Sequence, residues 1–126
     1  MSLSMIKRCL LFILPVSVII TLSGCRSAFK EDVDKVAAAM CKITGVMNKL
    51  RSADLADTAT LSKLQAEEQR LEEEMARINE AFRQKYKTKL TDENFRKEYS
   101  REIRKAILDC PYLSKEDRAR FEKEIN

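Results

Sequence analysis

Apolar residues recur every three or four positions along the stretch that follows residue 28. This spacing places them on one face of a helix, in the heptad pattern of packed helices. The face consists of Phe29, Val33, Val36, Met40, Ile43, Met47 and Leu50. Asp32 and Asp34 suit the positive amino end of a helix dipole. The pattern therefore predicts a helix from about Glu31 to Leu50.

A second apolar stripe follows a stretch without periodicity at Arg51–Thr60, which we expect to be a loop. The stripe consists of Leu61, Leu64, Leu71, Met75, Ile78, Phe82 and Tyr86. It predicts the longest helix, from about Thr60 to Lys87. The first half of this helix is acidic and the last half is basic, an order that complements the helix dipole at both ends.

Two further helices are predicted beyond residue 90. Thr91-Asp92-Glu93 is typical of a capped helix start, and Pro111 stops the helix that follows. Its apolar face consists of Phe95, Tyr99, Ile103, Ala106, Ile107 and Cys110. Ser114 with Asp117 resembles a capping box and predicts a short last helix with Phe121 and Ile125 as its apolar contacts.

No segment carries the pattern of a strand, so the sequence predicts an all-α fold. We expect residues 31–126 to form one small helical bundle, with three main amphipathic helices running up, down and up. The short C-terminal helix is expected to fold across one end. The coiled-coil-like seams are expected to form the core of this bundle rather than a site for a partner.

The first part of the chain has a different pattern. Lys7 and Arg8 form a short positive segment, and apolar residues dominate from Cys9 to Leu22. A positive start followed by an apolar centre of this length is typical of a secretory signal. A membrane-spanning helix needs about 20 apolar residues, and this run is shorter and is interrupted by Pro15.

The run ends at Leu22-Ser23-Gly24-Cys25, an aliphatic residue, two small residues and a cysteine. In these residues the chain resembles the precursors of bacterial lipoproteins, whose lipobox has this form. The resemblance implies a signal peptide at 1–24, cleavage between Gly24 and Cys25, and a diacylglyceryl group on the Cys25 sulfur, with palmitate among the acyl chains. Two or more chains hold a protein stably on a membrane. The alternative is an ordinary secreted protein or an uncleaved anchor.

The same resemblance implies a location in the cell envelope, with residues 25–30 as the linker between lipid and bundle. In enteric bacteria, Asp directly after the lipid-bearing cysteine favours retention in the inner membrane. Arg26 occupies that position here. The outer membrane is therefore expected where the host has two membranes.

The chain has four cysteines. Because Cys9 leaves with the signal and Cys25 carries lipid, Cys41 and Cys110 remain. Two remaining cysteines in an oxidising compartment favour a disulfide. At about 1.5 Å per helical residue, both reach the same height in an up-down-up bundle. Free buried thiols and pairing between chains are the alternatives.

Composition argues against several classes of function. The chain has no histidine, the commonest general base and transition-metal ligand, and only two glycines, too few for a phosphate-binding loop. The net charge of +4 falls further when the signal is removed, so no nucleic acid partner, metal or cofactor is expected. Glu72, Glu73 and Glu74 are expected to face water.

The function expected from these features is non-enzymatic. A lipid-anchored envelope protein would bind another envelope protein or give structural support, using exposed helix faces and the loop at Arg51–Thr60. The basic tract Arg83–Lys89 is expected to be a solvated helix end, with contact to anionic lipid or an acidic partner as the alternative. An inhibitor or immunity protein that neutralises a toxin or host enzyme is the second hypothesis. A cell-wall enzyme that uses carboxylates is the weakest.

Overall fold

The computed structural model describes residues 16–126, with side chains from Ala28 onward. These residues form four helices, α2 (Val16–Ser52), α3 (Thr58–Lys85), α4 (Glu93–Ile107) and α5 (Lys115–Ile125), and no strand is found among them. The fold is the predicted all-α fold, a bundle with three main helices and a short C-terminal one. Lys7 and Arg8 of the predicted signal lie outside the described residues.

The chain divides into two units, Met1–Glu31 and Asp32–Asn126. In the first unit the backbone is helical from Val16, so α2 begins well before the start near Glu31 that periodicity predicted. Amphipathic periodicity marks only the part of a helix that packs on one side, whereas a run of apolar residues has no polar face to reveal its helical phase. The predicted linker at 25–30 has helical backbone.

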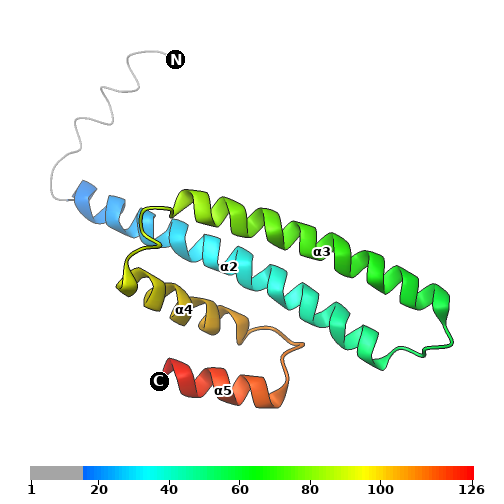
Figure 1. Ribbon diagram of the computed structural model, residues 1–126. Coiled ribbons are helices and arrows are strands. Elements are labelled where there is room, and N and C mark those ends of the chain that lie inside the picture. The colour runs from blue at the N-terminus through cyan, green and yellow to red at the C-terminus, as the bar shows by residue number, and fades with distance from the viewer. Residues whose placement is uncertain (1–15) are drawn as a thin grey trace, which may run out of the picture. The chain divides into compact units, whose positions relative to one another are not determined.

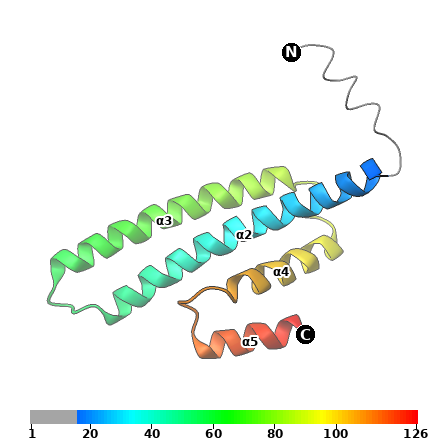
Figure 2. The same ribbon diagram turned by 180° about the vertical axis from the view of Figure 1, so that it is seen from behind.

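In the second unit, α2 and α3 lie side by side as an antiparallel hairpin, and a turn at 86–91 leads to α4 (Figures 1 and 2). An ion pair of 3.2 Å between Lys42 Nζ and Glu74 Oε1 joins the first two helices. α5 runs back along α4, where Arg104 Nε lies 3.0 Å from Glu124 Oε2. The prediction that the last helix crosses one end of the bundle was wrong, because this ion pair and the contacts of Arg118 described below direct it along α4.

The three helices that follow α2 each begin at a side-chain cap. Asp57 accepts a hydrogen bond of 3.0 Å from the Thr60 backbone N–H, and hydrogen bonds with Thr60 lower the pKa of Asp57. Asp92 accepts from the backbone N–H groups of Asn94 and Phe95. Ser114 accepts from the N–H of Asp117 and donates to its carboxylate. The caps predicted at Asp92 and Ser114 are confirmed.

Aromatic side chains fill the core where the end of α3 meets the start of α4. Four aromatic rings gather there, with centroids 4.7 Å apart for Phe82 and Tyr99 and 5.4 Å apart for Tyr86 and Phe95. Burial raises the pKa of the Tyr99 phenol. The buried apolar side chains of the described residues are Val33, Val36, Ala37, Ala39, Val46, Leu71, Phe82, Tyr86, Ile107 and Cys110.

The predicted seam of α2 is buried over only part of its length. Val33 and Val36 are buried, but Met40 and Met47 are 37% and 38% exposed. The reason is that α4 ends at Ile107, and the chain reaches the level of Cys41 at Cys110. Beyond this level α4 no longer runs along the hairpin (Figure 1), and the segment around Tyr112 covers only part of the seam.

A disulfide joins Cys41 and Cys110, whose Cα atoms are 5.6 Å apart, as the sequence predicted. Around it, the segment after α4 is held against its neighbours by three further contacts. Asn48 Nδ2 donates a hydrogen bond of 2.9 Å to the carbonyl of Tyr112. Arg118 donates to the carbonyls of Leu108 and Cys110. The ring of Tyr112 lies so close to Gly45 that a Cβ there would be 2.8 Å from Tyr112 Cε2.

Reduction of the disulfide should destabilise the protein by about 4 kcal/mol, because the bond closes a loop with a sequence separation of 69. We expect thiol alkylation, read by mass spectrometry, to leave Cys41 and Cys110 unmodified before reduction. The melting temperature should fall after it. The Cys41→Ser/Cys110→Ser variant should melt like the reduced protein and ignore reductant. Alkylation of both thiols in the unreduced protein would contradict this prediction.

Candidate functional site

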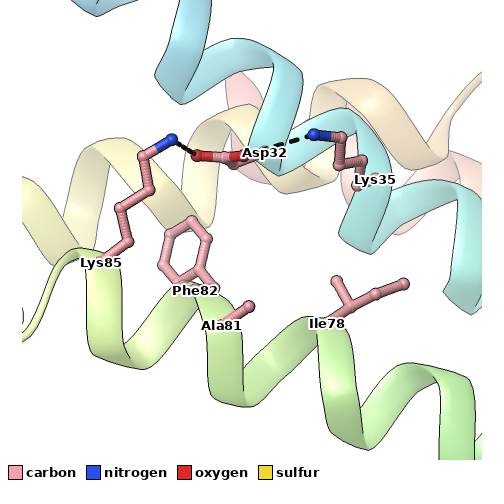
Figure 3. A pocket seen from close by; sticks show the side chains of 6 residues that line it. All are labelled: Asp32, Lys35, Ile78, Ala81, Phe82 and Lys85. Carbon is pink, nitrogen blue, oxygen red and sulfur yellow. Dashed lines mark hydrogen bonds and ion pairs between the residues drawn. The ribbon is translucent and has the colours of Figure 1, made fainter.

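One hollow of the second unit lies between α2 and α3, beside Asp32. It has a volume of about 150 Å³ and is lined by Asp32, Lys35, Ile78, Ala81, Phe82 and Lys85. Figure 3 shows Lys85 and Lys35 reaching the Asp32 carboxylate from different directions, with Phe82 and Ala81 on the α3 side. The hollow is therefore lined by a cluster of charged side chains and by apolar side chains of α3.

The carboxylate of Asp32 is fully engaged in this cluster. Lys85 Nζ donates to it at 2.6 Å and the Tyr86 hydroxyl at 2.8 Å, while Lys35 Nζ lies 3.8 Å away. Partial burial alone would raise the pKa of Asp32, but the hydrogen bonds from Lys85 and Tyr86, with the charges of Lys85 and Lys35, lower it below its ordinary value. The ionised Asp32 carboxylate thus links α2 to the end of α3 through hydrogen bonds and an ion pair.

The properties of this cluster suit a structural role better than a catalytic one. A general acid or base works best with a pKa near the operating pH, and the pKa of Asp32 is displaced in the opposite direction. The volume of about 150 Å³ is also below the roughly 300 Å³ at which small-molecule pockets begin. We therefore assign Asp32, Lys85 and Tyr86 to the attachment of α3 on α2.

A second hollow lies where the segment after α4 crosses α2. It has a volume of about 290 Å³ and is lined by Thr44, Met47, Asn48, Arg51, Tyr112, Ser114 and Asp117. Two of these residues are large and exposed, Met47 at 38% and Tyr112 at 46%. In the loop just beyond Arg51, Leu55 is 83% exposed. We call Met47, Arg51, Leu55 and Tyr112 the distal surface.

The distal surface has the composition of a protein-binding surface rather than of a catalytic centre. Tyr, Met and Arg are enriched in the cores of protein interfaces. The polar groups beside it form hydrogen bonds within the protein. The Asn48 amide donates to the Tyr112 carbonyl, and the Ser114 hydroxyl donates to the Asp117 carboxylate. Among the described residues, no His, Cys, Asp and Glu side chains come together as a group that could hold a metal ion.

The predicted lipidation and cleavage site, Gly24-Cys25, lies in the part of α2 whose side chains are outside the described residues. Its modification therefore stays a prediction. In the part of the chain that the structure describes, no helix has both the length and the apolar character needed to cross a bilayer. Glu72 and Glu73 are exposed as expected, and Glu74 pairs with Lys42 and Arg70.

Sequence reasoning missed two features of these sites. The pairing of Asp32 with Lys85 could have been sought from opposite charges at ends of two helices that an up-down bundle brings together. The contact between Gly45 and Tyr112 had a weaker signal, a glycine inside an otherwise strong helix. Comparison with models of protein families, with curated proteins and with solved structures finds no match to this chain.

Asp32→Asn should lower the free energy of unfolding by about 1 to 2 kcal/mol at neutral pH, because the charged hydrogen bond to Lys85 is lost. Since the pKa of Asp32 is lowered in the folded protein, its stabilisation is complete above the unfolded pKa of about 4. It is lost as the pH falls through the folded pKa. Urea unfolding at several pH values should therefore show the difference from wild type shrinking in acid.

Asp109→Asn is the matched control, since Asp109 is exposed and forms no ion pair among the described residues. It should change stability little at neutral pH. An Asp32→Asn effect that stays constant down to the lowest pH would contradict the assignment, because the charge of Asp32 would then contribute nothing.

Proposed function

We propose that this protein is a lipid-anchored lipoprotein of the cell envelope that acts by binding another protein, without catalysis. The observation that carries the proposal is Cys25, at the end of Leu22-Ser23-Gly24-Cys25 and directly after the apolar part of a secretory signal. In bacterial lipoproteins this pattern carries the lipid. Acyl chains on Cys25 would supply membrane affinity.

The bond between Cys41 and Cys110 supports the location outside the cytoplasm. Disulfides persist in oxidising compartments and are rare where glutathione and thioredoxin keep thiols reduced. This argument is independent of the signal and the lipobox, since it comes from residues of the bundle.

The distal surface supports the binding role. It presents large apolar side chains and one cation from three neighbouring segments, the end of α2, the loop after it and the segment after α4. Met47 lies fifteen residues along α2 from Asp32, about 22 Å at 1.5 Å per residue. A partner bound there would be held away from the end at which the chain enters the bundle.

Replacing Cys25 with Ala should abolish incorporation of labelled fatty acid and leave the full-length precursor, because the sulfur that accepts the lipid is gone. Metabolic labelling followed by electrophoresis measures both effects. The matched control is Cys9→Ala, which removes a cysteine outside the lipobox and should label and mature normally. Continued labelling of the Cys25→Ala chain would refute the anchor.

Replacing Leu55 with Asp should remove the crosslinked species formed in intact producing cells, because a charge in place of the most exposed apolar side chain of the distal surface opposes its apolar contacts. Leu55 is 83% exposed, so the melting temperature should not change. Ala119→Asp, the same charge at an exposed position of α5, is the matched control and should crosslink as the wild type does.

Mass spectrometry of the crosslinked species then separates the hypotheses. Recovery of a resident envelope protein supports the proposed function. A single stoichiometric foreign enzyme would favour the inhibitor or immunity role instead. Equal crosslinking of the Leu55→Asp and wild-type chains would show that the distal surface is not the binding surface.

A further inference from the structure

We propose that the end of the bundle at which Asp32 lies docks on the surface of a bilayer that contains anionic phospholipid. The docking groups are Arg83, Lys87, Lys89 and Arg96, which we call the basic end. The inference rests on the proposed anchor at Cys25. It adds to the anchor an orientation, with the basic end on the bilayer and the distal surface away from it.

The four residues of the basic end are exposed, and none of them forms an ion pair among the described residues. Neighbouring cations differ in this respect. Lys85 is bound to Asp32 at 2.6 Å and Lys97 to Glu93 at 2.7 Å. The basic end therefore carries positive charges whose interactions are left to solvent or to an anionic surface.

The charge is concentrated at this end of α3. Residues 83–97 contain six basic and two acidic side chains, whereas residues 67–80 contain six acidic and two basic ones. Within residues 83–97, Asp92 caps α4 and Glu93 pairs with Lys97, while on the neighbouring stretch of α2 Asp32 binds Lys85 and Asp34 adds a further carboxylate. Along α3 and the segment that follows it, the charge thus changes from negative in the middle of the helix to positive at its end and beyond.

Two ion pairs show where the basic and the acidic stretches lie along the bundle. Lys85 meets Asp32, and Tyr86, the first residue of the turn at 86–91, donates a hydrogen bond to the same carboxylate. Glu74 meets Lys42, ten residues further along α2, about 15 Å away. The Debye length at physiological salt is about 8 Å. A surface that touches the basic end would therefore interact with its cations, while the charges at the level of Glu74 and beyond are largely screened.

Chain length favours a bilayer over an acidic protein as the occupant. Asp32 follows Cys25 by seven positions, and even a fully extended chain over seven positions spans at most about 25 Å. Whatever course these residues take, lipid on Cys25 keeps the basic end close to a membrane. Its local concentration at the bilayer is then high without any further contact.

The expected strength can be stated as a ratio. Each Lys or Arg near an anionic bilayer changes binding about fivefold. Neutralising two of the four cations should therefore lower the ratio of docked to undocked molecules about 25-fold.

The test uses the protein purified from producing cells and reconstituted in vesicles of phosphatidylcholine, with or without phosphatidylglycerol. Amide hydrogen exchange is followed in the turn at 86–91, and in the loop at 53–57 as the internal reference. We expect exchange in the turn to slow several-fold only in vesicles with phosphatidylglycerol, while the loop is unchanged. Salt at about 1 M should abolish the effect, because the Debye length falls to about 3 Å.

Lys87→Gln/Lys89→Gln should lose the slowing in the turn. The matched control is Lys49→Gln/Lys63→Gln, which removes two exposed lysines near the other end of the hairpin and should keep it. Equal exchange in both kinds of vesicle would overturn the inference. So would slowing by soluble polyglutamate in the absence of any slowing by vesicles, which would indicate an acidic protein partner.

The mass of the N-terminal peptide of the same sample reports the lipid on Cys25 separately. A bare Cys25 with slowed exchange would refute the proposed anchor and support docking through the basic end. A lipidated Cys25 with unchanged exchange would support the proposed anchor and refute docking through the basic end.

Discussion

The Cys41–Cys110 bond is the constraint on which the arrangement of the last two helices depends. α5 contains no fully buried side chain, and Ile107 is the one buried residue within α4. Such short helices are marginal by themselves, since helix formation in water needs about 12 to 15 residues even in favourable sequences. The bond removes conformational freedom from the unfolded chain and brings the end of α4 to α2. The contacts of Tyr112 and Arg118 then form around it.

The second constraint is the charged tie of Asp32 to Lys85 and Tyr86. It acts at the other end of α4 from the disulfide, where the aromatic rings fill the core. The contacts of Asp32 attach the end of α3 to α2, and the disulfide attaches the end of α4 to α2 at a different height, with the apolar core between these two levels.

Much of this architecture could be predicted from the sequence because it depends on capping residues close together in the chain and on the periodic spacing of apolar residues. The caps at Asp92 and Ser114 depend on residues three positions apart, and the pairing of Cys41 with Cys110 follows from counting cysteines and helix rise. The Asp32 tie and the fit of Tyr112 on Gly45 could not be derived in the same way. They depend on the rotation of one helix against another, which a hydrophobic pattern leaves undetermined.

The exposure of Met40 and Met47 shows why the spacing of apolar residues alone does not predict how much of a helix face is buried. A heptad seam states which residues can be buried together, whereas burial itself requires a partner of sufficient length. α4 has 15 residues against 28 in α3, so the third helix covers only part of the seam. The uncovered part adjoins the distal surface, and the covered part adjoins the basic end. Unequal helix length thereby leaves apolar side chains exposed near one end, and the sequence places cations at the other, in a chain whose overall charge is only +4. This asymmetry suits the proposed function, in which one end is tethered and the other binds a partner.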